Sequence, residues 1–311
     1  MLPNLEPIPV AEVAASLGTI RRQALQRSDP PRRAVQLPSS QRLQAIVTSL
    51  RQALYPNRLG LLDPGSPLSS DAQVEACLVH SLEGLKEQVA IELSGRLGPA
   101  DPDAAHQRVI EEATAITRTF ALALPGIRQL LDSDIDAAYH GDPAADSLDE
   151  IVACYPGIKA ITHHRFAHVL HQQGVPVIAR IITEDAHAAT GIDIHPGARI
   201  GERFFIDHGT GVVIGGTAVI GKGVRIYQAV TLGAKSFPMD EQGHLIKGLP
   251  RHPIVEDDVV IYSGATILGR VTIGAGSTIG GNVWITESVP ANTTITQARA
   301  RQEIFGEGAG I

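Results

Sequence analysis

Cysteine is scarce in this sequence. The 311 residues include two, Cys77 and Cys154, and they do not form a CxxC pair. Such usage excludes a disulfide framework and a cysteine-rich metal site, and it suits a reducing compartment. There is also no run of about 18 apolar residues that could span a membrane, and the start, MLPNLEPIPV, lacks the basic and apolar regions of a signal peptide. We therefore expect a cytoplasmic protein without a membrane partner.

Positive charge and aromatic bulk are limited too. The chain carries 26 Lys and Arg against 33 Asp and Glu, for a net charge of −7, and it has no basic block. Nucleic acid is therefore not an expected partner. Aromatic residues make up 4% of the chain, whereas glycine occurs 31 times. Because globular cores normally take bulk from Phe and Tyr, this composition favours an architecture filled by layers of Ile, Val and Ala.

The first part of the chain has helical patterns. Residues 70–98 place apolar side chains every three or four positions after polar cap residues. Ser147 and Glu150 have the spacing of a capping box, and Pro176 is suited to the first turn of a further helix. We predict an N-terminal helical domain over residues 1–191.

From Ile192 onward the aliphatic residues recur every six positions. Such a period is typical of a parallel β-helix, in which each hexad forms one face of a triangular coil and coils bury a core by stacking. A sandwich of alternating strands would not keep this phase. We predict an α+β fold, with a β-helix over residues 192–289 and a flexible tail over 290–311. The repeated positions are Ile194, Ile200, Ile206, Ile214, Ile220, Ile226, Leu232, Val255, Ile261, Ile267, Ile273, Ile279 and Ile285.

Two departures from the repeat attract attention. The spacing from Ile206 to Ile214 is eight, and the extra residues fall in DHGTG, which contains His208. The phase is then lost between Leu232 and Val255, across a polar segment rich in Gly and Pro, which we expect to form a loop. Function tends to lie on loops held by a rigid scaffold. From spacing alone, His208 is either a turn residue or a catalytic base.

Several motifs resemble those of the serine O-acetyltransferase family. They are DPAAD, IDIHPGARIG, IDHGTGVVIGGTAVIG, VRIYQAVTLGA, RHPIVEDDVVIYSGATILG and the final GAGI, and together they span about residues 140 to 311. The resemblance implies a left-handed β-helix and trimers, often paired into hexamers by the N-terminal helices. It also implies acetyl transfer from acetyl-CoA to the hydroxyl of L-serine. The product, O-acetyl-L-serine, is made in the first step of cysteine biosynthesis.

The resemblance assigns the catalytic residues. A serine hydroxyl is a poor nucleophile at neutral pH, so a base must remove its proton, and a histidine is suited to this task. His208 would be the base and Asp193 the carboxylate that orients it. Asp193 precedes His208 by fifteen residues, roughly one coil, so the two can face each other on adjacent coils. His252 would face His208 across a subunit interface.

The resemblance also assigns binding residues for a zwitterionic substrate. Asp142 and Asp207 would hold the ammonium group, and Arg251 would bind the carboxylate, for which a planar guanidinium is suited. The alternatives are a turn or cap residue for Asp142 and a solvated loop charge for Arg251. Positions that match acetyl-CoA contacts of the family are Ala234, Ser263 and Gly281.

Partners follow from the same resemblance. L-cysteine shares the two charged ends of serine, so we expect it to inhibit. The Gly-rich tail that ends at Ile311 would insert into the active site of O-acetylserine sulfhydrylase, a case of carboxylate capture with one apolar anchor. An idle tail is the alternative. Rival functions are another hexapeptide-repeat O-acyltransferase, acting on a sugar or other hydroxyl, and an inactive scaffold that binds the sulfhydrylase.

Histidines raise the question of a metal. One predicted helix carries four histidines, which could in principle bind zinc. No Cys or acidic residue accompanies them at ligand spacing, so we favour a packed or polar helix face. Another group is His195, His208 and His252, which would suit a carbonic anhydrase of the β-helix type. That group fits less well than the acetyltransferase motif, and we expect no metal. The four helical residues are His163, His164, His168 and His171.

Overall fold

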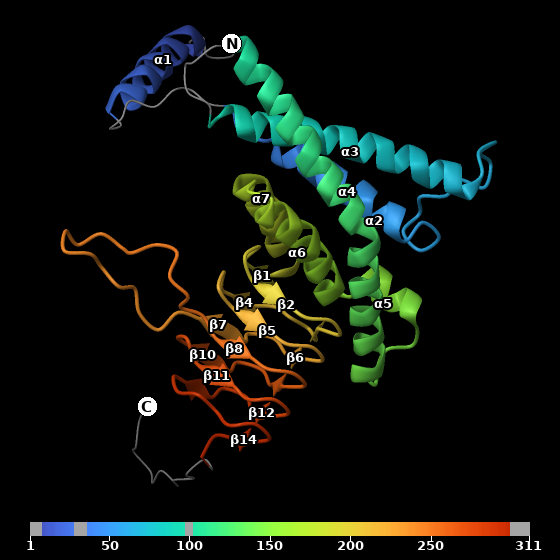
Figure 1. Cartoon of the computed structure of the whole chain (residues 1–311), viewed down its shortest axis with the longest axis vertical. Helices are drawn as coiled ribbons and strands as arrows, with labels where there is room; N and C mark the ends of the chain where they lie inside the picture. Colours follow the sequence, from blue (N-terminus) through green and yellow to red (C-terminus); the bar gives the residue numbers. More distant parts are fainter. Residues whose placement is uncertain (1–7, 28–35, 97–101, 299–311) are drawn as a thin grey trace, which may run out of the picture. The chain divides into compact units, whose positions relative to one another are not determined.

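The structure, a computed structural model, describes residues 8–27, 36–96 and 102–298 (Figure 1). The chain divides into two compact units, residues 1–37 and 38–311. The first contains helix α1 (Val10–Arg27), which has no buried residue. None of the helices in the described ranges has both the length and the apolar character needed to cross a membrane.

Six further helices precede the strands, as the sequence predicted. Helices α2 and α3 begin with serine caps, since the Ser39 and Ser69 side chains accept backbone N–H groups of the first turn. Helices α6 and α7 instead have a proline in the first turn and no side-chain cap. The predicted capping box is formed in part: Ser147 Oγ accepts the Glu150 N–H at 3.1 Å, whereas Glu150 accepts the N–H of Asp146, one residue before the cap, at 2.8 Å. The helices are α2 (Ser40–Leu54), α3 (Ser70–Ser94), α4 (Pro102–Gly141), α5 (Leu148–Cys154), α6 (Pro156–Gln172) and α7 (Pro176–Thr190).

The remainder of the described chain, up to residue 298, is a left-handed parallel β-helix of three sheets. Sheet A contains β1 (Asp193–Ile194), β4 (Val213–Ile214), β7 (Thr231–Gly233), β10 (Thr266–Leu268) and β13 (Trp284–Ile285). Sheet B contains β2 (Arg199–Ile200), β5 (Val219–Ile220), β8 (Ile254–Val255) and β11 (Thr272–Ile273). Sheet C contains β3 (Phe205–Ile206), β6 (Arg225–Ile226), β9 (Val260–Ile261), β12 (Thr278–Ile279) and β14 (Thr294–Ile295).

The repeated aliphatic residues form the core of this coil. Ile194, Ile214, Leu232 and Ile267 pair in register along sheet A, and each is almost fully buried. The two extra residues of DHGTG are absorbed in one corner: Asp193 pairs with Val213, twenty positions on, whereas Val213 pairs with Thr231, eighteen on. The inward-facing stack is therefore kept, and the added chain is pushed outward.

The ends of the repeat differ slightly from expectation. Strand β14 pairs with β12, so the coil continues beyond residue 289, where we expected the tail to begin. The stretch TTIT at 293–296 supplies one more β-branched rung. Residues 234–250 form the expected loop, which extends away from the coil between β7 and β8 as an arm with an antiparallel bridge between Met239 and Leu245 (Figure 1).

A buried ion pair links the helices to the first coil. Arg165 on α6 donates to both carboxylate oxygens of Asp134 on α4, at 2.7 and 2.8 Å, and neither side chain is appreciably exposed. Arg165 also donates to the Gly201 carbonyl, while Asp134 accepts the Phe204 N–H at 2.9 Å. The charges are thus satisfied from three elements, and this fixes how the helices approach the corner between β2 and β3.

Removing half of this pair should be costly. We expect Asp134→Ala to lower the free energy of unfolding by about 3–5 kcal/mol, because it leaves a buried guanidinium without a counter-charge. The control is Glu87→Ala, which breaks an exposed pair with Arg42 and should cost less than about 1 kcal/mol. Urea unfolding followed by circular dichroism measures both, and equal losses would contradict the structural role of Asp134.

Candidate active site

The corner between β3 and β4, residues 207–212, carries the predicted base. His208 has a left-handed backbone (φ 56°) and a side chain that is 71% exposed. Its Nδ1 lies 3.8 Å from Asp207 Oδ1, and the Asp207 side chain is largely buried. The corner therefore presents an exposed imidazole beside a largely buried carboxylate.

Asp142 lies near this corner at the end of α4. Its carboxylate accepts the Tyr155 hydroxyl at 2.6 Å and the Ala144 N–H at 2.8 Å. These two hydrogen bonds lower the pKa of Asp142, and the nearby charges of His208 and Arg225 act in the same direction. Asp142 is therefore an anion at neutral pH, as a partner of an ammonium group should be.

Asp193 lies one coil away from His208 at the same corner. Its N–H donates to Val212 O, and Gly209 is so close to Ile192 that an added Cβ would lie 2.4 Å from the isoleucine Cδ1. The Asp193 and His208 side chains, both described, form no hydrogen bond or ion pair with each other. Asp193 instead lies 3.9 Å from Arg180 on α7. The pairing of Asp193 with His208 stays a prediction.

The predicted residues of the loop line a cavity of about 350 Å³ at the corner between sheets A and B. Asp193, His195, Thr217, Arg251 and His252 are among its lining residues. His252 is 8% exposed. Burial lowers the pKa of His252 to about 4, and the charges of Arg251, His195 and Arg270 add to the effect. This imidazole is consequently neutral at physiological pH.

Arg251 is anchored through its backbone, and the residue lines the cavity. Its backbone N–H donates to Thr217 Oγ1 at 2.9 Å, and its guanidinium lies 5.8 Å from the ring centroid of Phe237 in the arm. The Nε atom is buried and has no hydrogen-bond partner. Since buried donors are normally paired, Arg251 is suited to receive an anionic group from a ligand.

The predicted residues thus form two groups within one chain. Asp142, Asp207 and His208 lie at the corner between sheets C and A, whereas Arg251 and His252 lie at the corner between A and B. Within the described chain, no contact joins the two groups. The predicted acetyl-CoA positions divide likewise: Ser263 and Gly281 stack on successive coils along the first corner, and Ala234 follows β7 at the second.

Neither histidine group forms a metal site in the described residues. One possible three-ligand cluster is found there, Glu184, His187 and Asp193 on α7 and β1. The helical histidines are instead packed: His164 is buried, which lowers its pKa, and His168 contacts the Pro196 carbonyl through Nδ1 at 2.8 Å.

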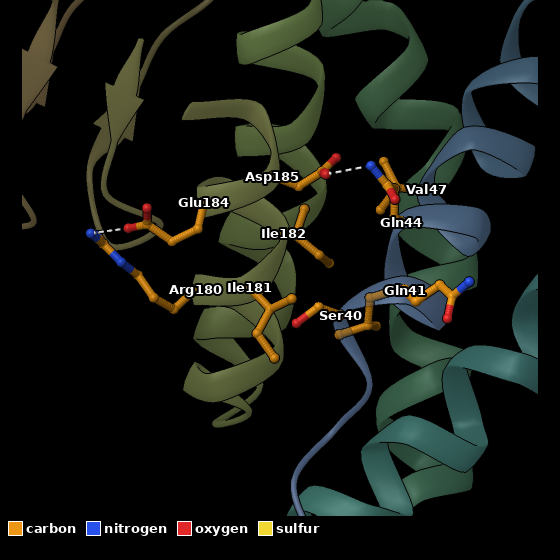
Figure 2. Close-up of a pocket in the computed structure, with 10 residues that line it drawn as sticks. Ser40, Gln41, Gln44, Val47, Arg180, Ile181, Ile182, Glu184 and Asp185 are labelled. Atoms are coloured by element: carbon orange, nitrogen blue, oxygen red, sulfur yellow. Dashed lines mark hydrogen bonds and ion pairs between the residues drawn. The ribbon is translucent and has the colours of Figure 1, made fainter. Parts of the chain in front are cut away.

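A separate cavity of about 450 Å³ lies between α2 and α7, where Gln44 donates to Asp185 at 2.8 Å (Figure 2). It contains no predicted site residue.

Sequence reasoning missed Tyr155 and Thr217. Tyr155 supports Asp142, and Thr217 contacts both Arg251 and His252. Thr217 stands inside the quoted motif IDHGTGVVIGGTAVIG, but a threonine beside two glycines has no spacing signal of its own. Its partners are 34 and 35 residues away, across the loop.

Comparisons with known proteins place these features in a family. The model described as "Bacterial transferase hexapeptide (six repeats)" matches residues 252–287. A plasmid serine acetyltransferase of Synechococcus elongatus is 56% identical over 277 residues, which are 88% of this chain and 86% of the relative. The serine acetyltransferase of Mycobacterium tuberculosis is 47% identical over 162 residues, 52% of this chain and 67% of its own.

Solved structures agree with the sequence matches. Native serine acetyltransferase 1 of Entamoeba histolytica aligns with a TM-score of 0.69 and 34% identity, covering 90% of this chain and 96% of its own. Its complex with L-cysteine gives 0.67 and 38%, covering 86% and 88%. Neisseria gonorrhoeae serine acetyltransferase in complex with serine gives 0.53 and 28%, covering 83% and 97%.

The match to the Synechococcus relative extends over nearly the whole length of both proteins. At 277 residues it is longer than the hexapeptide coil alone, and the native Entamoeba structure covers a similar share of the chain. The chain belongs to the serine acetyltransferase family.

Proposed function

We propose that this protein transfers the acetyl group of acetyl-CoA to the hydroxyl of L-serine, releasing CoA and O-acetyl-L-serine. The observation that carries the proposal is the separation of opposite charges. Asp142 and Asp207 provide two carboxylates, and Arg251 provides a guanidinium with an unpartnered buried Nε. A zwitterion that carries a hydroxyl on its side chain suits this arrangement, and relatives have been solved with serine and with cysteine.

His208 acts as the general base. Its imidazole takes the hydroxyl proton as the serine oxygen attacks the thioester carbonyl, and the C–S bond then breaks as the proton passes to the departing thiolate. Asp207 at 3.8 Å and Asp193 one coil away stabilise the imidazolium that forms.

The active site forms between subunits of a homotrimer, which can pair into a hexamer. The basis is the division of the site: His208 and His252 lie at different corners of one triangular coil, so a neighbouring chain can bring one corner against the other. Acetyl-CoA lies along the coil between such corners, near Ser263 and Gly281 of one chain and Ala234 of the next.

Regulation and partners follow from the same chemistry. L-cysteine presents the ammonium and carboxylate that serine presents, so it occupies the serine position and inhibits. The tail that ends at Ile311 binds O-acetylserine sulfhydrylase; this segment lies outside the described residues.

The activity is tested by the release of CoA thiol from acetyl-CoA in the presence of L-serine. We expect His208→Ala to lower kcat/KM by about 10²–10⁴-fold, because it removes the base. The matched control is His244→Ala, since His244 is also exposed and lies 3.6 Å from Asp240. Thiol release with sugars but not with serine would instead favour the other hexapeptide acyltransferases. A wild type that is inactive with all these acceptors would favour the inactive scaffold that binds the sulfhydrylase.

The shared site is tested by mixing two inactive chains. Co-expressed His208→Ala and His252→Ala chains should regain up to about a quarter of wild-type activity, because about three quarters of randomly assembled trimers are mixed and each mixed trimer rebuilds one intact interface of three. Mixed trimers isolated from the rest should reach about a third. Two affinity tags isolate the mixed assemblies. A chain carrying both substitutions, mixed with His208→Ala, rebuilds no interface and is the control. If the mixture is no more active than its parents, the site lies within one chain.

The role of Tyr155 is tested by the pH dependence of serine binding. Asp142 has a lowered pKa in the folded protein, so its charge persists on acidification and is lost as the pH falls through that value. Tyr155→Phe removes the first cause of the lowering, and serine affinity should then begin to fall at a higher pH. Calorimetric titration measures this without turnover. In Asp142→Asn, addition of Tyr155→Phe should change nothing further.

A further inference from the structure

Two groups of Thr217 meet the same nitrogen of His252. The Thr217 backbone N–H donates to Nδ1 at 3.1 Å, and the Thr217 hydroxyl lies 2.8 Å from it. The hydroxyl oxygen itself accepts the backbone N–H groups of Arg251, at 2.9 Å, and of His252, at 3.2 Å. Thr217 therefore ties together both residues that end the loop.

These contacts decide the tautomer of His252. A backbone N–H can only donate, so Nδ1 must be an acceptor and carries no proton. The hydroxyl oxygen already accepts two hydrogen bonds, which directs its own hydrogen to Nδ1 as well. In a neutral imidazole the single proton is then on Nε2. The cationic form, with protons on both nitrogens, would lose both contacts from Thr217.

The surroundings keep this ring neutral. His252 is buried, and its charged neighbours are the cations Arg251 and Arg270 together with His195. Arg270 donates to the Thr217 and His252 carbonyls at 2.7 and 3.0 Å, which closes the same loop from the next coil. A neutral imidazole with a proton on Nε2 is a hydrogen-bond donor and is not a base at that atom.

The Nε2 edge of the ring lies over Gly215, which lines the cavity together with His252. The ring lies on Gly215, where an added Cβ would lie 2.0 Å from Cδ2 and 2.2 Å from Nε2. Among the hydrogen bonds of the described residues, none has Nε2 as a partner. His252 lines the cavity together with Arg251. The imidazole and the guanidinium therefore line one cavity, where the anionic part of a ligand is expected.

We infer that Thr217 is a positioning residue that holds His252 with its proton on Nε2, so that this N–H donates to an anionic oxygen of the reacting serine and thioester. The oxygen is either the serine carboxylate or the oxyanion that forms on the thioester carbonyl. The inference rests on the proposed function and deepens it: His252 is a donor, and the base is His208 alone.

Substitutions at 252 test the donor role. A Gln amide reaches about as far as Nε2 and can donate there, whereas Asn and Ala cannot reach it. We expect His252→Gln to stay within about 10-fold of wild-type kcat/KM, and His252→Asn and His252→Ala to lose about 10²–10³-fold. A loss in kcat identifies the carbonyl oxyanion, and a rise in KM for serine identifies the carboxylate. If His252→Gln is as impaired as His252→Ala, the donor role is wrong.

Substitutions at 217 test the positioning role. Thr217→Ser keeps the hydroxyl and should match wild type within about 3-fold, whereas Thr217→Val should lose about 10-fold or more in kcat/KM at unchanged fold by circular dichroism. Equal activities of Thr217→Val and wild type would overturn the inference. A Thr217→Ser variant that folds as wild type but is as impaired as Thr217→Val would also overturn it.

The tautomer is read directly by ¹⁵N NMR of histidine-labelled protein, with His252→Gln used to assign the signals. At neutral pH, His252 should show one unprotonated nitrogen at Nδ1 and one protonated nitrogen at Nε2. A proton on Nδ1 would overturn the inference whether or not the enzyme acetylates serine. An inactive wild type with the expected tautomer would instead count against the proposed function alone.

Discussion

The stacking of one aliphatic side chain per six residues is the constraint on which this molecule depends. Each inward residue fixes the phase of its face, so each outward or corner residue has a fixed place on the prism. Because the core is a continuous column, an extra stretch cannot enter a face without breaking the stack. Added chain therefore collects at corners, and the candidate chemistry lies there: the corner at 207–212 carries His208, and Arg251 and His252 directly follow the loop at 234–250.

This constraint explains what the sequence predicted well. The period of six gives the three-sided coil and its register, and the two departures from it mark the corners with His208 and with Arg251. The helical part was also predictable from caps, because a serine at an N-cap accepts from residues only two or three positions away. The end of the coil was placed too early, since Ile295 follows Ile285 by ten residues and so falls outside the six-residue phase.

What the sequence could not give is contact between distant segments. Asp134 and Arg165 are 31 residues apart on two helices, and neither stands out from other charged residues until burial is known. The handedness of the coil is not contained in a period either, and it came from family resemblance. The proximity of Asp193 to Arg180 likewise depends on how α7 meets the first strand, which no local pattern specifies.

Gly215 is required by the packing of the His252 ring rather than by the geometry of the coil. Along its column of sheet A, the next coils place Gly233 and then Leu268. A coil that accepts leucine there does not require glycine for its own geometry. At 215 a methyl group would occupy the space of the His252 ring. The space at this position is thus limited by a side chain that lies 37 residues further along the chain, and an alanine there would displace the imidazole while keeping the inward-facing stack.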